Sequence, residues 1–158
     1  MGSGKTTLGK ILSKKLDKTF FDSDQVIEEK LGVVVPMIFE YEGEAGFRER
    51  EKEILKELVS KKNIILATGG GVILSKFNRD LLSEIGIVIY LKSNQKDLIS
   101  RMKNDKTRPL LRNGNIESII KKLCEEREPL YEMISDFEVT TKNKRVNEIV
   151  NEIISITK

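Results

Sequence analysis

The sequence predicts an α/β fold with a parallel sheet, because short apolar runs alternate along the chain with amphipathic helical stretches. Two of the runs, residues 63–67 and 87–91, are almost continuously apolar, which is typical of strands buried on both faces. The chain has 158 residues, of which 39% are hydrophobic, and contains no repeat, low-complexity segment or linker. We therefore expect one domain spanning residues 1–158.

The first predicted element is a helix that follows a glycine-rich start. Its apolar residues recur at helical spacing: Leu8, Ile11, Leu12 and Leu16. A short strand at 19–21 leads to an acidic turn, and the next helix, 24–31, is predicted to end at Gly32 because glycine adopts the left-handed conformation found after helices.

The middle of the chain is predicted to be mostly helical from residue 37 to residue 59, with a break near 42–46. Pro36 suits the first turn of that helix. The rest of the chain alternates again, with strands at 63–67, 87–91 and 137–140 and helices at 75–84, 94–103, 116–131 and 146–156. The segment 104–115 is polar, basic and without periodicity.

The chain opens on Met-Gly-Ser-Gly-Lys-Thr-Thr, which matches the second half of the phosphate-binding P-loop, Gly-x-x-x-x-Gly-Lys-[Ser/Thr]. Glycines let the backbone approach phosphate closely, Lys5 would reach the β- and γ-phosphates, and the Thr6 hydroxyl would ligate Mg²⁺. A flexible N-terminus or an expression scar is the competing interpretation. The helix that follows directly favours a nucleoside-triphosphate site.

The first glycine of the full pattern would lie two residues before Met1, and a P-loop normally follows a β-strand. In P-loop folds this strand usually lies inside the sheet, so without it both neighbouring strands keep unpaired N–H and C=O groups, at roughly 1 to 3 kcal/mol each. We therefore expect the functional protein to begin about eight residues earlier, and a chain extended by such a strand to be more stable.

Other candidate residues follow strands or lie on helices. In Asp22-Ser23-Asp24, one carboxylate can hold Mg²⁺ through water and the other can accept a proton from a substrate hydroxyl, although Asp24 could instead cap its helix. Gly69-Gly70-Gly71 indicates a backbone that something must approach closely. The charged run from Phe47 to Glu51 could equally be a solvated helical face.

Taken in order, these motifs resemble the shikimate kinase family, small ATP-dependent kinases of the nucleoside-monophosphate-kinase type, from Met1 to about Thr141. The matching motifs are Gly-Ser-Gly-Lys-Thr, Asp-Ser-Asp, Ile38-Phe39-Glu40, Gly43-Glu44, Phe47-Arg48, Ala67-Thr68-Gly-Gly-Gly, Arg108-Pro-Leu-Leu and Arg127-Glu-Pro-Leu-Tyr. The resemblance implies a three-layer α/β/α P-loop kinase whose parallel sheet has five strands, the first of them absent from this sequence. It also implies a lid at about 104–115 and a substrate-binding helical segment at about 33–60.

The implied activity is phosphorylation of the 3-hydroxyl of shikimate by MgATP, giving shikimate 3-phosphate and ADP, in the route to chorismate and the aromatic amino acids. By matching position, shikimate would be bound by Asp24, Arg48, Gly69, Gly70, Gly71 and Arg127. ATP would be bound by Gly2, Ser3, Gly4, Lys5, Thr6, Thr7, Arg101 over the adenine and Arg108 in the lid. Mg²⁺ would be held by Thr6 and, through water, by Asp22. The catalytic residues would be Lys5, Asp24 and Arg108.

Composition narrows the function further. The sequence contains no histidine, which excludes imidazole chemistry, and its single cysteine, Cys124, reads as a small, at least half-buried hydrophobe. The net charge of +3 arises from 28 basic and 25 acidic residues that are interspersed, which argues against a nucleic-acid face. No apolar run approaches the roughly 18 residues of a membrane span. We expect a cytoplasmic monomer that binds shikimate and ATP, and neither nucleic acid nor membrane.

Three alternatives remain open from the sequence. Another P-loop small-molecule kinase, for gluconate or a nucleotide, is the nearest, although two arginines beside Asp24 and three glycines favour a hydroxylated carboxylate. A non-catalytic kinase-like module would be expected to lose Lys5, Asp22 or Asp24, and all three are present. A nucleic-acid-binding domain is disfavoured by the absence of aromatic platforms.

Overall fold

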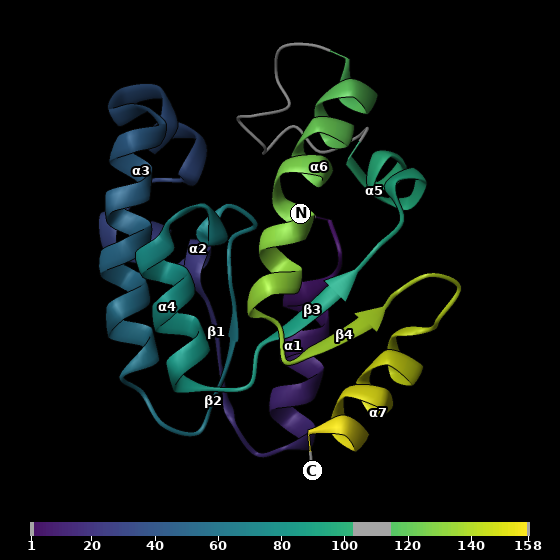
Figure 1. Ribbon diagram of the computed structural model, residues 1–158. Helices are drawn as coiled ribbons and strands as arrows, with labels where there is room; N and C mark the ends of the chain where they lie inside the picture. Colours follow the sequence, from purple (N-terminus) through teal and green to yellow (C-terminus); the bar gives the residue numbers. More distant parts are fainter. Residues whose placement is uncertain (1, 103–114, 158) are drawn as a thin grey trace.

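The computed structural model describes residues 2–102 and 115–157, in which helices surround short parallel strands (Figure 1). The strands are β1 (Thr19–Asp22), β2 (Ile64–Ala67), β3 (Ile89–Lys92) and β4 (Phe137–Thr140). The helices are α1 (Lys5–Lys15), α2 (Ser23–Leu31), α3 (Val35–Val59), the 3-10 turn η1 (Val72–Leu74), α4 (Lys76–Ile85), α5 (Gln95–Met102), α6 (Ile116–Ile134) and α7 (Val146–Ile156).

The strands form two parallel pairs rather than one sheet. β1 pairs with β2, from Thr19 opposite Ile64 to Asp22 opposite Ala67, and β3 pairs with β4. A cavity of about 1280 Å³ lies between β2 and β3 and is lined along the whole of both strands. The four strands expected from the sequence are therefore present, and the described sheet is divided at one internal seam.

Local sequence explains where the first helices begin and end. Gly4, at φ 88°, precedes α1, and Gly32, at φ 68°, ends α2 in the left-handed conformation that the sequence predicts. Pro36 lies in the first turn of α3, as expected. Gly43, at φ 71° and ψ −177°, breaks that helix inside the predicted interval 42–46, because this backbone conformation is open to glycine and strained for other residues.

Most predicted boundaries agree with the structure to within one or two residues, and the larger differences involve β3, α6 and η1. β3 is shifted toward Lys92, because Val88 accepts the hydrogen bonds that open the ladder with β4 and Ile87 lies outside it, 57% exposed. α6 runs past the predicted end at residue 131 to Ile134, which packs in one cluster with Val72 of η1. Packing thus extends α6 beyond Tyr131 and stabilises η1, an element that local sequence did not predict.

Apolar side chains form separate clusters on the two sides of the seam. On the β4 side, α1 and α7 pack together through a buried set: Leu8, Leu12, Val139, Ile149, Val150 and Ile153. On the β1 side, α2 and α3 contribute another: Ile27, Ile38, Phe47, Ile54 and Leu58. Cys124 is half-buried beside Ile120, as expected of a small hydrophobe. Within residues 2–102 and 115–157, no helix is both long and apolar enough to cross a membrane.

Candidate active site

The glycine-rich start forms a tight loop ahead of α1. Gly2 and Gly4 have φ values of 66° and 88°, and Ser3 between them is buried. The carbonyl oxygen of Gly2 accepts a hydrogen bond from Nη1 of Arg101 at 2.9 Å. This loop leads directly into the N-terminus of α1, where backbone N–H groups and the helix dipole favour an anion. Lys5 is the first residue of that helix and Thr7 lies exposed in its first turn.

Thr6 and Asp22 meet at the carboxyl end of β1. The Thr6 hydroxyl donates to Oδ2 of Asp22 at 2.6 Å, so the two predicted magnesium residues lie side by side. The other carboxylate oxygen of Asp22 accepts the backbone N–H of Asp24 at 3.1 Å. Asp22 is therefore the N-cap of α2, and the interpretation of Asp24 as that cap is wrong.

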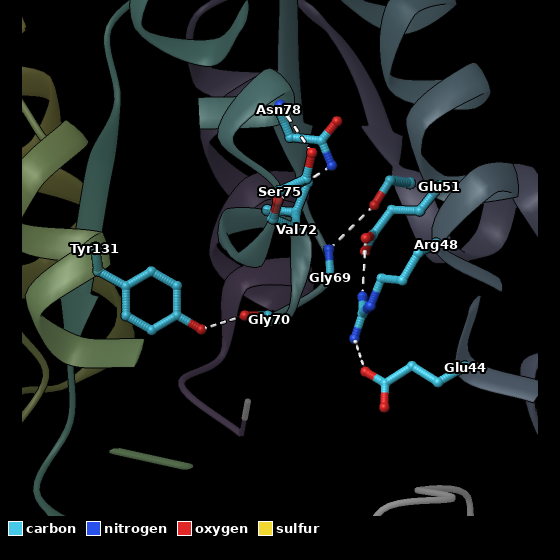
Figure 2. A network of polar contacts seen from close by, with 10 residues as sticks. Glu44, Arg48, Glu51, Gly69, Gly70, Val72, Ser75, Asn78 and Tyr131 are labelled. Atoms are coloured by element: carbon cyan, nitrogen blue, oxygen red, sulfur yellow. Dashed lines mark hydrogen bonds and ion pairs between the residues drawn. The ribbon is translucent and has the colours of Figure 1, made fainter. Parts of the chain in front are cut away.

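The glycine loop after β2 is held from two sides (Figure 2). The N–H of Gly69 donates to Oγ of fully buried Ser23 at 3.1 Å. From the opposite side, the hydroxyl of Tyr131 on α6 donates to the carbonyl oxygen of Gly70. Burial raises the pKa of Tyr131 and the nearby charge of Arg127 opposes this rise, so Tyr131 keeps the proton that this bond requires.

The glycines allow side chains to approach the loop closely. A Cβ atom at Gly69 would lie 2.7 Å from Oδ1 of Asp24 and 3.1 Å from Oε1 of Glu51. A Cβ atom at Gly71 would overlap the guanidinium of Arg48. The close approach expected at these glycines is confirmed, and the groups that make it are the side chains of Asp24, Arg48 and Glu51.

Arg48 lies between two carboxylates of its own helix (Figure 2). Its Nη1 donates to Oε2 of Glu51 at 2.8 Å and its Nη2 to Oε1 of Glu44 at 2.9 Å. Glu51 is fully buried, whereas Glu49 and Arg50 are exposed. The interpretation of this run as a solvated charge face therefore holds for Glu49 and Arg50 only.

Glu51 interacts with both of the arginines predicted to bind the substrate. It bonds Arg48 and feels the charge of Arg127. Burial raises the pKa of Glu51, Arg48 opposes that rise with its charge and hydrogen bond, Asp24 adds to it, and Arg127 opposes it. Arg127 is itself buried on α6, so side chains from α2, α3 and α6 converge beside the glycine loop. Among the described residues, the buried Nε atoms of Arg48 and Arg127 have no hydrogen-bond partner. Two cations with unused donors suit an anionic ligand.

Sequence reasoning did not assign roles to Ser23, Glu44 or Glu51. The signal for Glu51 was present, because its position continues the buried stripe of α3 formed by Phe47, Ile54, Leu55 and Leu58. A carboxylate in an apolar stripe needs a partner, which points to Arg48 one turn earlier. The bonds of Ser23 and Tyr131 to the glycine loop join residues far apart in sequence and leave no local signal.

Several of the predicted site residues border one region. Ser3, Lys5, Gly69, Gly70 and Arg127 line the cavity beside β2 and β3. Asp24 and Arg48 adjoin the glycine loop from α2 and α3. Arg108 and most of the predicted lid, 104–115, lie outside the described residues, apart from Asn115, which caps α6 by accepting the N–H of Glu117 at 2.9 Å.

A scan against family models matches residues 1–158 to the model described as Shikimate kinase. The chain belongs to the shikimate kinase family. Proteins named shikimate kinase from Burkholderia lata and Nitrosococcus oceani are 47% and 49% identical to it over 154 residues, which is 98% of this chain and 84% and 81% of theirs.

Solved structures agree with this membership. A shikimate kinase from Acinetobacter baumannii, solved in complex with shikimate, superposes with a TM-score of 0.96 at 42% identity and covers 99% of this chain and 87% of its own. The resemblance drawn from the motifs is confirmed, as is the P-loop kinase fold. The chain is an enzyme of the shikimate kinase family, whose members use ATP as co-substrate.

Proposed function

We propose that this protein transfers the γ-phosphate of ATP to the 3-hydroxyl of shikimate, giving shikimate 3-phosphate and ADP, as a step toward chorismate and the aromatic amino acids. The observation that carries the proposal is a pair of arginines, half-buried Arg48 and buried Arg127, beside the glycine loop and Asp24. Shikimate combines a carboxylate with ring hydroxyls, so it needs cationic donors at one end and a hydrogen-bond acceptor at the other.

The arginines would bind the shikimate carboxylate. Each carries a buried Nε donor without a partner among the described residues. Glu51 would keep Arg48 oriented through the 2.8 Å bond, and the exposed bond to Glu44 is the one that a substrate carboxylate could replace. A lysine would supply the charge but not the planar pair of donors.

Asp24 and the glycine backbone would hold the hydroxyl groups. The Oδ1 atom of Asp24 would lie 2.7 Å from a Cβ atom at Gly69, so its carboxylate is in close contact with the glycine loop. A carboxylate there can accept the proton of the attacking hydroxyl as the phosphoryl group is transferred.

The nucleotide would lie on the loop formed by Gly2, Ser3 and Gly4, with Lys5 at its phosphates and Arg101 over the adenine. Thr6 would ligate Mg²⁺ through its hydroxyl and Asp22 would hold the ion through water. The two oxygen atoms lie 2.6 Å apart and are hard donors of the kind that Mg²⁺ prefers. Bound there, the ion would neutralise phosphate charge. Within the described ranges, no cluster of three or more metal-binding side chains offers another site.

The proposal also covers the oligomeric state, location and partners of the protein and the roles of two of its segments. Residues 1–158 would act as one monomeric, cytoplasmic kinase domain without nucleic-acid or membrane partners. The α3 region, 33–60, would bind shikimate, and 104–115, with Arg108, would close over the nucleotide. Closure excludes water and so limits wasteful hydrolysis of ATP.

A substrate panel tests the proposal. ADP release from MgATP is measured with shikimate, its methyl ester, gluconate and nucleoside monophosphates, and product is identified by mass spectrometry. We expect shikimate alone to be phosphorylated efficiently, since the ester keeps the hydroxyls but lacks the charge that the arginines bind. Efficient phosphorylation of gluconate or a nucleotide, with none of shikimate, would reject the proposal.

A further inference from the structure

The glycine loop after β2 contains a β-turn at 69–72. The N–H of Val72 donates to the carbonyl oxygen of Gly69 at 3.3 Å, which is the bond between the first and last residues of such a turn. Gly71, the third residue, has φ −92° and ψ −3°, close to the values of about −90° and 0° that define a type I turn. The loop therefore has the type I form.

Local sequence does not select this form. Type I and type II turns differ mainly in the orientation of the peptide between the second and third residues, and type II has a positive φ at the third, where glycine is favoured. Gly71 must lack a side chain, because a Cβ atom there would overlap the guanidinium of Arg48. The same glycine removes the steric penalty on a positive φ, so the peptide between Gly70 and Gly71 can turn over unless another group holds it.

Tyr131 of α6 is the group that holds this peptide. Its hydroxyl donates to the carbonyl oxygen of Gly70, and its ring stacks on Tyr90 of β3 with the centroids 5.0 Å apart. Burial raises the pKa of Tyr131, and Arg127 opposes the rise through its charge and a hydrogen bond to the Tyr131 side chain. Because a guanidinium has donors only, the hydroxyl oxygen accepts from Arg127 and the hydroxyl proton is directed to Gly70. The type II form would turn the carbonyl of Gly70 away and break this bond.

The bond from Tyr131 also fixes the direction of the N–H of Gly71. The peptide is trans, so its N–H is directed opposite to its C=O. Figure 2 shows Tyr131 on one side of Gly70 and Arg48 on the other. The N–H of Gly71 is therefore directed away from Tyr131, to the side of Arg48. Within residues 2–102 and 115–157 this N–H has no hydrogen-bond partner, so it can donate to a ligand.

We propose that Tyr131 is a positioning residue that selects the type I form of the turn at 69–72 and so keeps the N–H of Gly71 directed to the side of Arg48, where it donates to bound shikimate. The assignment of the turn is independent of the substrate, whereas the identity of the ligand rests on the proposed function. Without the hydroxyl, the type II form would become populated. Part of the binding free energy would then be needed to turn the peptide back, which weakens the apparent affinity.

Steady-state kinetics of Tyr131→Phe test the consequence for binding. The variant lacks the hydroxyl but keeps the ring that stacks on Tyr90. Because one hydrogen bond no longer favours the type I form, the shikimate KM should rise about three- to tenfold. Saturating shikimate restores that form, so kcat and the ATP KM should stay within a factor of about two. Tyr90→Phe is the matched control and should change none of these values, because the hydroxyl that it removes from the same stacked pair bonds Glu128 at 3.4 Å.

The form of the turn is measured by nuclear Overhauser effects in the ligand-free protein, so this readout does not depend on the substrate. In a type I turn, a ψ of about −30° at Gly70 brings its amide proton close to that of Gly71, whereas about +120° in type II brings an α-proton of Gly70 there instead. We expect a strong amide–amide effect in the unmodified protein and Tyr90→Phe, and a strong α-proton–amide effect in Tyr131→Phe. A lower melting temperature of Tyr131→Phe with neither this change nor a higher shikimate KM would show a purely structural bond and overturn the proposal.

Amide hydrogen exchange in the unmodified protein tests the ligand contact without any variant. Saturating shikimate should slow exchange of the Gly71 amide at least about tenfold. The amide of Val72, which already bonds Gly69, is the internal control and should change little. Bound shikimate that leaves the Gly71 amide unprotected would overturn the proposal. A protein that neither binds nor phosphorylates shikimate would instead reject the proposed function, and the Overhauser pattern would still decide whether Tyr131 selects the turn.

Discussion

The polar cluster beside the glycine loop, formed by Ser23, Arg48, Glu51 and Tyr131, and the seam between β2 and β3 differ in how their polar groups are satisfied. In the polar cluster, Arg48 bonds Glu51, and Ser23 and Tyr131 bond the glycine loop, while apolar residues of α2 and α3 form a buried core. At the seam, two backbone edges and apolar side chains line a cavity. A helix can satisfy its own backbone and bring side chains to a site, whereas a strand edge depends on another strand.

The largest expected effect is on catalysis beside the glycine loop. Asp24→Asn keeps the shape of the side chain but removes the carboxylate that would accept the proton, so we expect kcat to fall by about 10² to 10⁴-fold with a small change in the shikimate KM. Steady-state kinetics with MgATP and shikimate measure this. Asp80→Asn is the matched control, because Asp80 is exposed and pairs only with Lys76 among the described residues. A kcat within a factor of about two of the unmodified enzyme would remove Asp24 from catalysis.

The free energy of unfolding tests whether the α2–α3 cluster is packed more tightly than the seam. Leu58 is 1% exposed in the α2–α3 cluster, so Leu58→Ala should lower the free energy of unfolding by about 2 to 5 kcal/mol. Ile87 lines the seam but is 57% exposed, and Ile87→Ala should cost less than about 1 kcal/mol. Urea unfolding of both variants gives the two values. Equal costs would show that the seam is as tightly packed as the helical cluster.

A smaller effect is expected on substrate binding. Arg127→Ala removes a charged hydrogen bond worth roughly 1.5 to 3 kcal/mol, so the shikimate KM should rise by about ten- to a hundredfold while kcat changes less. Arg127→Lys should restore part of the affinity, because it keeps the charge without the planar donors. Arg50→Ala is the control, since Arg50 pairs with Glu42 on the exposed side of α3. An unchanged KM in Arg127→Ala would place the substrate carboxylate elsewhere.

The smallest effect concerns pH. Burial raises the pKa of Glu51 above its ordinary value of 4.5, against the opposing influence of Arg48. The native state therefore holds this proton to higher pH than the unfolded state, and stability is lost as pH rises from about 4.5 through the raised pKa, by about 1.4 kcal/mol per unit of difference.

Glu51→Gln lacks this ionisation. The free energy of unfolding of the unmodified protein, relative to the variant, should therefore fall as pH rises across that interval, which urea unfolding at a series of pH values would measure. Glu57→Gln is the control, because its exposed carboxylate pairs with Lys30 and its pKa is lowered. If the stability difference between Glu51→Gln and the unmodified protein did not change with pH, the pKa of Glu51 would be the same in the native and unfolded states.

Much of the secondary structure follows from local sequence. Gly32 and Gly43 interrupt helices where their positive φ values require glycine, Pro36 marks the start of α3, and the bounds of β4 and α7 agree with the predictions. These features depend on steric preferences and on the period of apolar residues, which a sequence displays directly. The larger differences, which are the shift of β3, the extra element η1 and the longer α6, depend on packing between elements distant in sequence.

The residue types of the site were also readable from sequence, because motif spacing indicates phosphate, hydroxyl and carboxylate chemistry. Tertiary structure decided how these residues are held. Asp22 rather than Asp24 caps α2, Glu51 lies buried against Arg48, and Ser23 and Tyr131 hold the glycine loop from opposite sides. It also decided which strands are neighbours, β1 with β2 and β3 with β4. Side-chain chemistry and helical period are local properties, whereas hydrogen-bond partners and strand neighbours are set by contacts between residues far apart along the chain.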